Sequence, residues 1–313
     1  MLKKHQKPLE VKDQVKNLKS IGLIIKDEDK AEKLLNDISY FRIVKGYSLG
    51  LKDKETGLYK KEVSFDSLKQ LYLFNAKLRY IIFPEIEKVE INLRCRMANY
   101  FSLKYGVLGY LNVNNFENPN YHTDFLKDTQ IEIARNSKAP FVKNFKNNYD
   151  GGELPFYAVV ELLSFGTLSK LFKNMKNEDK KAIANIYGIK YTYIQSWIEH
   201  LAFVRNICAH YGRLYNINFS KSPLLFSEYS KLGVSNLRVY ATLICLKHLL
   251  SNDDHWERFV ARIGELLMDY PEVQKDLMGF PKDGDDWGEI LLLPIDEIRK
   301  KQKIKSLTCR ENL

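Results

Sequence analysis

The stretch YTYIQSWIEHLAFVRNICAHY, residues 191–211, decides the fold of this chain. Its apolar side chains recur at spacings of four, three and four residues, at Trp197, Leu201, Val204 and Cys208. This spacing places them on one face of an α-helix, and a helix with such a stripe buries it against neighbouring elements. Gly212 follows directly and is a typical residue at a helix end. The stretch therefore predicts a core helix.

The rest of the sequence repeats this helical pattern. Further helices are predicted over residues 27–41, 66–105, 155–171, 177–187, 237–250 and 255–268. Pro155 is well placed at a helix start, whereas Pro84 is expected to kink or interrupt the long helix that contains it. We therefore predict an all-α fold, a helical bundle with an additional helical N-terminal region.

A few segments depart from the helical pattern. Residues 47–65 predict one small β-hairpin that turns around Lys54 to Gly57. Residues 111–123 and 146–154 are rich in Asn, Asp and Gly and predict loops. The expected organisation has four parts: an N-terminal helical region with the long helix (1–110), a loop-rich basic connector (111–154), a helical bundle (155–290) and a basic tail (291–313).

Composition limits the classes of function. The chain has 313 residues, of which 45% are hydrophobic, and its 49 Lys and Arg against 39 Asp and Glu give a net charge of +10. This length is sufficient for a large core, and the charge favours nucleic acid or another anionic surface as a partner.

Cysteine usage and hydropathy indicate a compartment. The four cysteines are scattered, without the spacing of a zinc site or a disulfide framework, at Cys95, Cys208, Cys245 and Cys309. We expect no metal and no cofactor. The basic N-terminus has no apolar segment behind it, and no apolar run approaches membrane-spanning length. The sequence therefore predicts a cytoplasmic protein.

The polar face of the predicted core helix carries the candidate catalytic residues. Asn206 and His210 are four residues apart and share a face, and Arg205 lies between them at the edge of the apolar stripe. The fork of donors on Arg205 suits a phosphate group, and an imidazole can move a proton near neutral pH. In the last helical turn, free carbonyls favour a protonated imidazole at His210. The three side chains are expected to converge on one surface.

Other residues are candidate RNA contacts. Arg213 is a second candidate phosphate ligand beside the motif. Lysines at 138, 143 and 146 alternate with aromatic residues, an arrangement that suits backbone contacts and base stacking, and further lysines follow at 173 and 176. These candidates are Lys138, Lys143, Lys146, Lys173 and Lys176. Glu90 and Arg94 are expected to form an ion pair on a helix surface, and Glu161 is expected to be a surface charge, with a role in orienting Arg205 as the alternative.

The chain resembles the Abi-like abortive-infection family of bacteria, the AbiD/AbiF group of phage-defence proteins. The resemblance runs from about residue 15 to 290. The stretches that carry it are LKSIGLII (18–25), ISYFRIVKGY (38–47), LR (78–79), IEKVEINLR (86–94), LPFYAVVELLSFG (154–166) and VRNICAH (204–210).

This resemblance implies a fold and an activity. Such proteins are similar to the HEPN superfamily, helical bundles whose ribonucleases carry an Arg-polar-x-x-x-His motif, here Arg205, Asn206 and His210. HEPN ribonucleases build their site from two motif copies, and this chain has one convincing copy, so the resemblance implies a homodimer with a composite site. Type VI CRISPR effectors carry two such motifs in one chain. The AbiF group is linked to a structured non-coding RNA encoded nearby. Tyr211 departs from the family pattern, in which a second His is frequent.

We therefore expect a metal-independent endoribonuclease. One His210 would take the proton of a ribose 2′-OH, a second His210 would protonate the leaving 5′-oxygen, and Arg205 would stabilise the charge that develops on phosphorus. Two alternatives remain open. The first is a non-catalytic RNA-binding protein whose affinity falls steeply with salt. The second is a protein-interaction scaffold or antitoxin-like partner with a large exposed apolar face.

Overall fold

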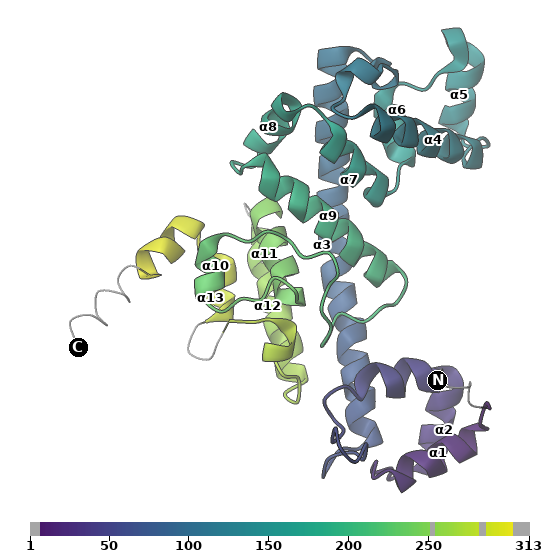
Figure 1. The fold of residues 1–313 in the computed structure, drawn as a ribbon, viewed down its shortest axis with the longest axis vertical. Helices are drawn as coiled ribbons and strands as arrows, with labels where there is room; N and C mark the ends of the chain where they lie inside the picture. The colour runs from purple at the N-terminus through teal and green to yellow at the C-terminus, as the bar shows by residue number, and fades with distance from the viewer. Residues whose placement is uncertain (1–6, 251–253, 282–285, 303–313) are drawn as a thin grey trace. The chain divides into compact units, whose positions relative to one another are not determined.

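A computed structural model describes residues 7–250, 254–281 and 286–302 of the chain (Figure 1). These residues form helices and no β-strand, which confirms the all-α prediction. The α-helices in chain order are α1 (Val11–Ser20), α2 (Glu28–Asp37), α3 (Phe65–Tyr105), α4 (Pro119–Arg135), α5 (Pro140–Asn148), α6 (Phe156–Leu162), α7 (Phe165–Asn174), α8 (Asn177–Asn185), α9 (Tyr191–Ala209), α10 (Ser227–Lys231), α11 (Val239–Leu250), α12 (Asp254–Asp269) and α13 (Trp287–Leu292).

The chain divides into two compact units, and the border between them lies inside α3. The first unit contains the residues up to Arg79 together with Glu265–Val273, and the second contains Tyr80–Gly264 and the residues from Gln274 onward. Helix α3 continues through Pro84 without a break, contrary to the alternative of an interrupted helix. Buried apolar side chains flank Pro84 on both sides, at Ile81, Ile82, Ile86 and Val89. Their packing offsets the backbone hydrogen bond that proline removes.

In the first unit, the predicted β-hairpin is reduced to a tight turn. One isolated antiparallel bridge joins Lys52 and Tyr59, and the turn between them lies where the sequence placed it. The carboxylate of Asp53 accepts hydrogen bonds from the backbone N–H groups of Glu55 (3.0 Å) and Thr56 (2.8 Å), which stabilises the turn. Strands do not extend from it, because a residue with positive φ interrupts the extended backbone on each side: Gly50 (83°) and Glu62 (68°).

In the second unit, helices occupy much of the segment for which loops were predicted. The side chain of Asn118 accepts hydrogen bonds from the backbone N–H groups of Asn120 and Tyr121, and Pro119 follows it in the first turn of α4. This Asn-Pro pair is a helix start signal that the loop prediction overlooked. Helix α5 likewise begins at a proline, Pro140.

The long helix predicted from Pro155 is two helices. Helix α6 ends at Leu162 and α7 begins at Phe165, with a bend of 111° between them. The hydroxyl of Ser164 accepts a hydrogen bond from the backbone N–H of Thr167 (3.0 Å) and so caps α7. In the part of the chain that the structure describes, no single helix has both the length and the apolar composition to cross a membrane, although the bent pair that contains α6 and α7 passes the same test.

The basic tail is in part ordered. Residues 295–302 are helical, and Ile298 within them is buried. Arg299 pairs with Glu228 (2.7 Å) and with Asp296 (2.8 Å). The rest of the tail, residues 303–313, lies outside the described residues, as do the first six residues of the basic N-terminus and Cys309.

Helix α9 forms the centre of the second unit. It packs against α7, α8 and α11, and the ring of Trp197 on its buried face is fully enclosed. His200 on the same helix is also fully buried. Its Nδ1 lies 2.6 Å from the carbonyl oxygen of Lys221, and its Nε2 lies 2.9 Å from the hydroxyl of Thr242. This imidazole is therefore a structural part of the core.

The burial of His200 predicts acid sensitivity. Burial lowers the pKa of His200 to about 4, whereas an imidazole in an unfolded chain titrates near 6.5. Below about pH 6.5 the unfolded chain therefore binds more protons than the folded chain, and the free energy of unfolding falls as the pH approaches 4. His200 alone is expected to contribute a loss of about 2 kcal/mol between pH 7 and pH 5, measured by urea unfolding of wild type and a His200 variant. His200→Gln should be less stable at pH 7 but should show a shallower loss; an unchanged slope would contradict this assignment.

Candidate active site

Helix α9 presents the faces that its sequence predicted. The side chains of the apolar stripe, Trp197, Leu201, Val204 and Cys208, are buried. On the other side, Arg205 is half-buried, and Asn206 and His210 are exposed. The candidate motif is thus held at one end of a rigid core helix, with two of its three side chains open to solvent.

The end of α9 fixes the backbone around His210. His210 is the C-cap residue, and its N–H donates to the carbonyl of Asn206 (3.0 Å). The next two N–H groups, of Tyr211 and Gly212, donate to the carbonyls of Cys208 (3.1 Å) and Ile207 (2.7 Å). These bonds form a Schellman motif, in which the left-handed position is taken by Tyr211 with φ of 57°. The helix therefore ends where predicted, but the left-handed residue is the tyrosine.

Gly212 is required for a different reason, the close approach of the backbone to Ile207. A Cβ atom at position 212 would lie 2.7 Å from Cγ2 of Ile207 and 3.0 Å from its carbonyl oxygen. We expect Gly212→Ala to lower the free energy of unfolding by about 1–3 kcal/mol, since the overlap forces the helix end to shift. Gly166→Ala in α7 is the matched control, because a Cβ there would meet only ordinary contact, 3.6 Å from the hydroxyl of Ser164. Equal stability of the two variants in urea unfolding would show that the helix end is not tightly packed.

A buried carboxylate on α3 anchors Arg205. The Nε of Arg205 lies 3.6 Å from Oε2 of Glu90, whose side chain is only 11% exposed. The other carboxylate oxygen of Glu90 pairs with the guanidinium of Arg94, one turn further along α3. The ring of Phe83 also lies 5.9 Å from the guanidinium of Arg205. These contacts fix the stem and Nε of Arg205, while its side chain remains 38% exposed.

Arg94 connects this carboxylate to the end of α6. Its guanidinium donates to the carbonyl of Leu163 (2.6 Å) and to the carbonyl of Val160. The last carbonyls of a helix have no partner within the helix, so a buried cation here satisfies groups that would otherwise be costly. A continuous set of contacts therefore runs from the end of α6 through Arg94 and Glu90 to Arg205 on α9.

This arrangement changes the interpretation of two acidic residues. Glu90 and Arg94 do pair, but the pair is buried, not on the helix surface as predicted. Glu161, the weighed alternative for orienting Arg205, is exposed, in agreement with its prediction as a surface charge. The signal that identifies Glu90 was present in the sequence: it lies four residues after Ile86 and three or four before Leu93 and Arg94, on the apolar face of the long helix.

Asn206 faces a different neighbour from Arg205. It borders a cavity of about 480 Å³ that α4, α7 and α9 enclose, which Lys170, Lys173 and Lys221 also line. Arg205 and His210 are not among the lining residues. Adjacent positions on one helix point about 100° apart, so Arg205 meets α3 while Asn206 meets the cavity. Of the predicted RNA contacts, the structure brings Lys173 together with Asn206.

The remaining predicted RNA contacts have varied surroundings. Lys138 precedes α5, and Lys143 and Lys146 lie on it; all three are exposed. Lys176 is half-buried at the N-cap of α8, and Arg213 is half-buried in the segment after α9. Within the described residues, no group of three His, Cys, Asp or Glu side chains is placed to hold a metal ion.

Comparison with known proteins gives one match. A family model described as Abi-like protein matches residues 33–216, more than half of the chain, and the matched segment contains Glu90, Arg94 and the whole stretch from Arg205 to His210. No curated protein and no solved structure matches the chain.

Proposed function

Since the chain belongs to the Abi-like protein family, we propose that it is an abortive-infection protein whose activity is metal-independent cleavage of RNA. One observation carries this proposal. Arg205 is held by a buried carboxylate, and His210, five residues later on the same core helix, is exposed. A positioned cation and an accessible imidazole at the end of one helix supply the two functions that RNA transesterification needs: charge stabilisation at phosphorus and a proton carrier.

In the proposed reaction, the 2′-oxygen of a ribose attacks the adjacent phosphorus. The imidazole of one His210 accepts the 2′-hydroxyl proton, the P–O5′ bond breaks, and a second, protonated imidazole gives its proton to the leaving 5′-oxygen. The guanidinium of Arg205 donates to the phosphate oxygens on which negative charge develops. The products are a 2′,3′-cyclic phosphate and a 5′-hydroxyl.

The second imidazole is the reason to propose a homodimer. The motif occurs once in the chain. A single imidazole cannot at the same moment accept the 2′-hydroxyl proton and donate a proton to the leaving 5′-oxygen. A two-fold pairing that brings two copies of α9 together supplies both groups. The proposed partner at the site is therefore a second copy of the chain.

The basic side chains extend the proposed RNA contact beyond the motif. Lys173 lies beside Asn206 at the cavity, and Arg213 follows the motif closely in the chain. Exposed lysines on and before α5, together with Lys176, add positive charge that suits a phosphate backbone. We propose that a small non-coding RNA bound by these groups restrains the enzyme, because free activity would endanger the host cell.

The proposal is tested by incubating the purified chain, stripped of nucleic acid, with a single-stranded RNA and with DNA of the same sequence, in EDTA. Cleavage of the RNA alone is expected, because DNA lacks the 2′-hydroxyl nucleophile. Cleavage of both, or cleavage that EDTA abolishes, would contradict it.

A second candidate function is RNA binding without cleavage. The observation that favours it is the negative charge of Glu90, which pairs with both Arg94 and Arg205. This charge offsets part of the attraction that Arg205 would exert on the negative charge of a transition state. In that case His210→Ala and wild type bind RNA equally, with affinity that falls steeply with salt, and neither cuts.

A further inference from the structure

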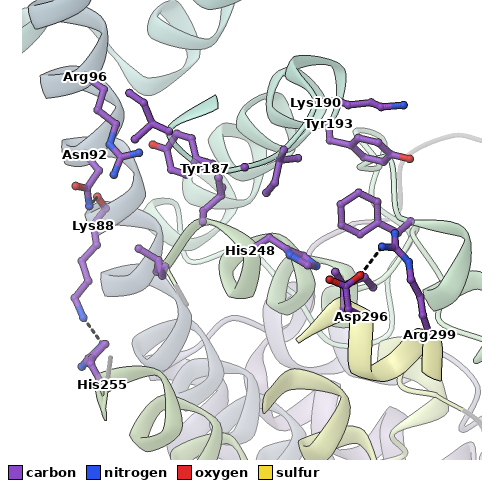
Figure 2. A pocket seen from close by; sticks show the side chains of 17 residues that line it. Lys88, Asn92, Arg96, Tyr187, Lys190, Tyr193, His248, His255, Asp296 and Arg299 are labelled. Atoms are coloured by element: carbon purple, nitrogen blue, oxygen red, sulfur yellow. Dashed lines mark hydrogen bonds and ion pairs between the residues drawn. The ribbon is translucent and has the colours of Figure 1, made fainter. Parts of the chain in front are cut away.

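A basic pocket lies at the opposite end of α9 from the motif. It has a volume of about 870 Å³, within the usual range for small-molecule sites, and Figure 2 shows the side chains that line it. Its walls come from the second half of α3, the turn after α8, the start of α9, the end of α11 and residues 295–299. Tyr193 in this pocket precedes Arg205 by twelve residues of helix, a separation of ~18 Å along the axis. The pocket is thus distinct from the motif.

Some of the positive charge in this pocket is already compensated. Lys88 pairs with the buried carboxylate of Glu85 (3.1 Å), which also meets His255 (2.9 Å). Arg299 is held by Glu228 (2.7 Å) and Asp296 (2.8 Å). These groups form the walls of the pocket and leave little charge for a ligand.

Arg96 and Lys190 carry the charge that remains. The guanidinium of Arg96 stacks on the ring of Tyr187, 4.2 Å from its centroid, and Arg96 has no carboxylate partner among the described residues. Its side chain is half-buried at the pocket, so this uncompensated charge is open to a ligand. Lys190, which follows the turn after α8, is exposed at the same pocket. In Figure 2, Lys190 lies on the side of Tyr193, away from Arg96, so Arg96 is the cation placed to bind a phosphate group opposite the aromatic side.

The other side of the pocket is aromatic. The rings of Tyr193 and Phe226 are 4.6 Å apart, both half-buried, and both line the pocket. In Figure 2, Arg96 and Tyr193 lie on opposite sides of the space. His248 lies between them, and burial lowers its pKa to about 3, so it adds an aromatic surface without a charge. Base stacking on aromatic rings is favourable for every base.

From these contacts we propose that the basic pocket binds a nucleotide, with its phosphate monoester on Arg96 and its base against Tyr193 and Phe226. The same chemistry has two sources, a free mononucleotide and the phosphorylated end of a single-stranded RNA. The site uses neither Arg205 nor His210, so it is independent of the proposed cleavage.

The test is calorimetric titration of the full chain with AMP, UMP and adenosine. We expect the nucleotides to bind at least tenfold more tightly than adenosine. Arg96→Met, which keeps the stem over Tyr187, should weaken nucleotide binding at least tenfold and leave adenosine unchanged. Tyr193→Leu should weaken the binding of nucleotides and of adenosine alike. Arg135→Met is the matched control, because Arg135 is exposed on α4 and lines none of this pocket.

A second arm distinguishes the source. The His210→Ala chain is titrated with an RNA pentamer that carries a 5′-phosphate and with the same pentamer carrying a 5′-hydroxyl. If the chain prefers the phosphorylated pentamer and Arg96→Met removes that preference, the site binds RNA ends. If the preference for phosphate is limited to mononucleotides, the site binds the free ligand. If neither probe shows a phosphate preference, or if Arg96→Met or Tyr193→Leu binds as wild type does, the proposal is overturned. Tyr193→Leu stays informative if Arg96→Met fails to fold.

Discussion

His210→Ala is expected to reduce the rate of RNA cleavage by about 10²- to 10⁴-fold, the usual effect of removing a general acid or base. The side chain is exposed at the C-cap of α9, so its removal leaves the core intact. Arg205→Ala should produce a loss of similar size through the charge on phosphorus. The measurement is the initial rate of cleavage of one labelled RNA in EDTA.

The matched control for this prediction is Arg135→Ala. Arg135 is an exposed arginine at the end of another helix, α4, where it pairs with Glu132 (2.6 Å). It should cut at the wild-type rate with the same thermal stability. If His210→Ala, folded as wild type, cuts at the wild-type rate too, His210 is not a catalytic residue.

Glu90→Ala is expected to lower the free energy of unfolding by about 3–5 kcal/mol and to remove cleavage as well. The substitution leaves the buried cation of Arg94 without its carboxylate, and an unpaired buried charge is among the most costly changes in a core. It also releases Arg205 from α3. Urea unfolding measures the first effect and the cleavage rate the second.

A double substitution separates these two roles of Glu90. Glu90→Leu with Arg94→Met removes both buried charges, and replacing a buried pair with apolar side chains is often close to neutral. The carbonyls of Val160 and Leu163 lose a donor, so we expect stability between that of wild type and Glu90→Ala. Cleavage should stay low, because Arg205 still lacks its anchor. Recovery of cleavage together with stability would show that Glu90 has only a structural role and does not position Arg205.

The sequence predicted the element that carries the motif because its signal is local. The stripe from Trp197 to Cys208 is strictly periodic, and periodicity alone determines which face of α9 is buried. Gly212 after it predicted the helix end. The left-handed conformation falls on Tyr211, one residue before Gly212, and hydropathy periodicity does not distinguish these two positions.

The partner of Arg205 could not be assigned in the same way. Glu90 and Arg205 are far apart in the sequence, and only the packing of α9 against α3 joins them. Glu161, the weighed alternative, is exposed, and the predicted helix that contains it ends before the bend at Ser164. Capping residues such as Ser164 and Asn118 mark these bends, and hydropathy alone overlooks them.

The most direct test of the account is the chemistry of the RNA ends that the wild-type chain leaves in EDTA. Attack by the ribose 2′-hydroxyl predicts a 2′,3′-cyclic phosphate on one fragment and a 5′-hydroxyl on the other, both absent when Arg205→Ala or His210→Ala replaces wild type. Fragments with 5′-phosphate and 3′-hydroxyl ends, or cyclic phosphates formed equally by all three chains, would contradict the proposed site.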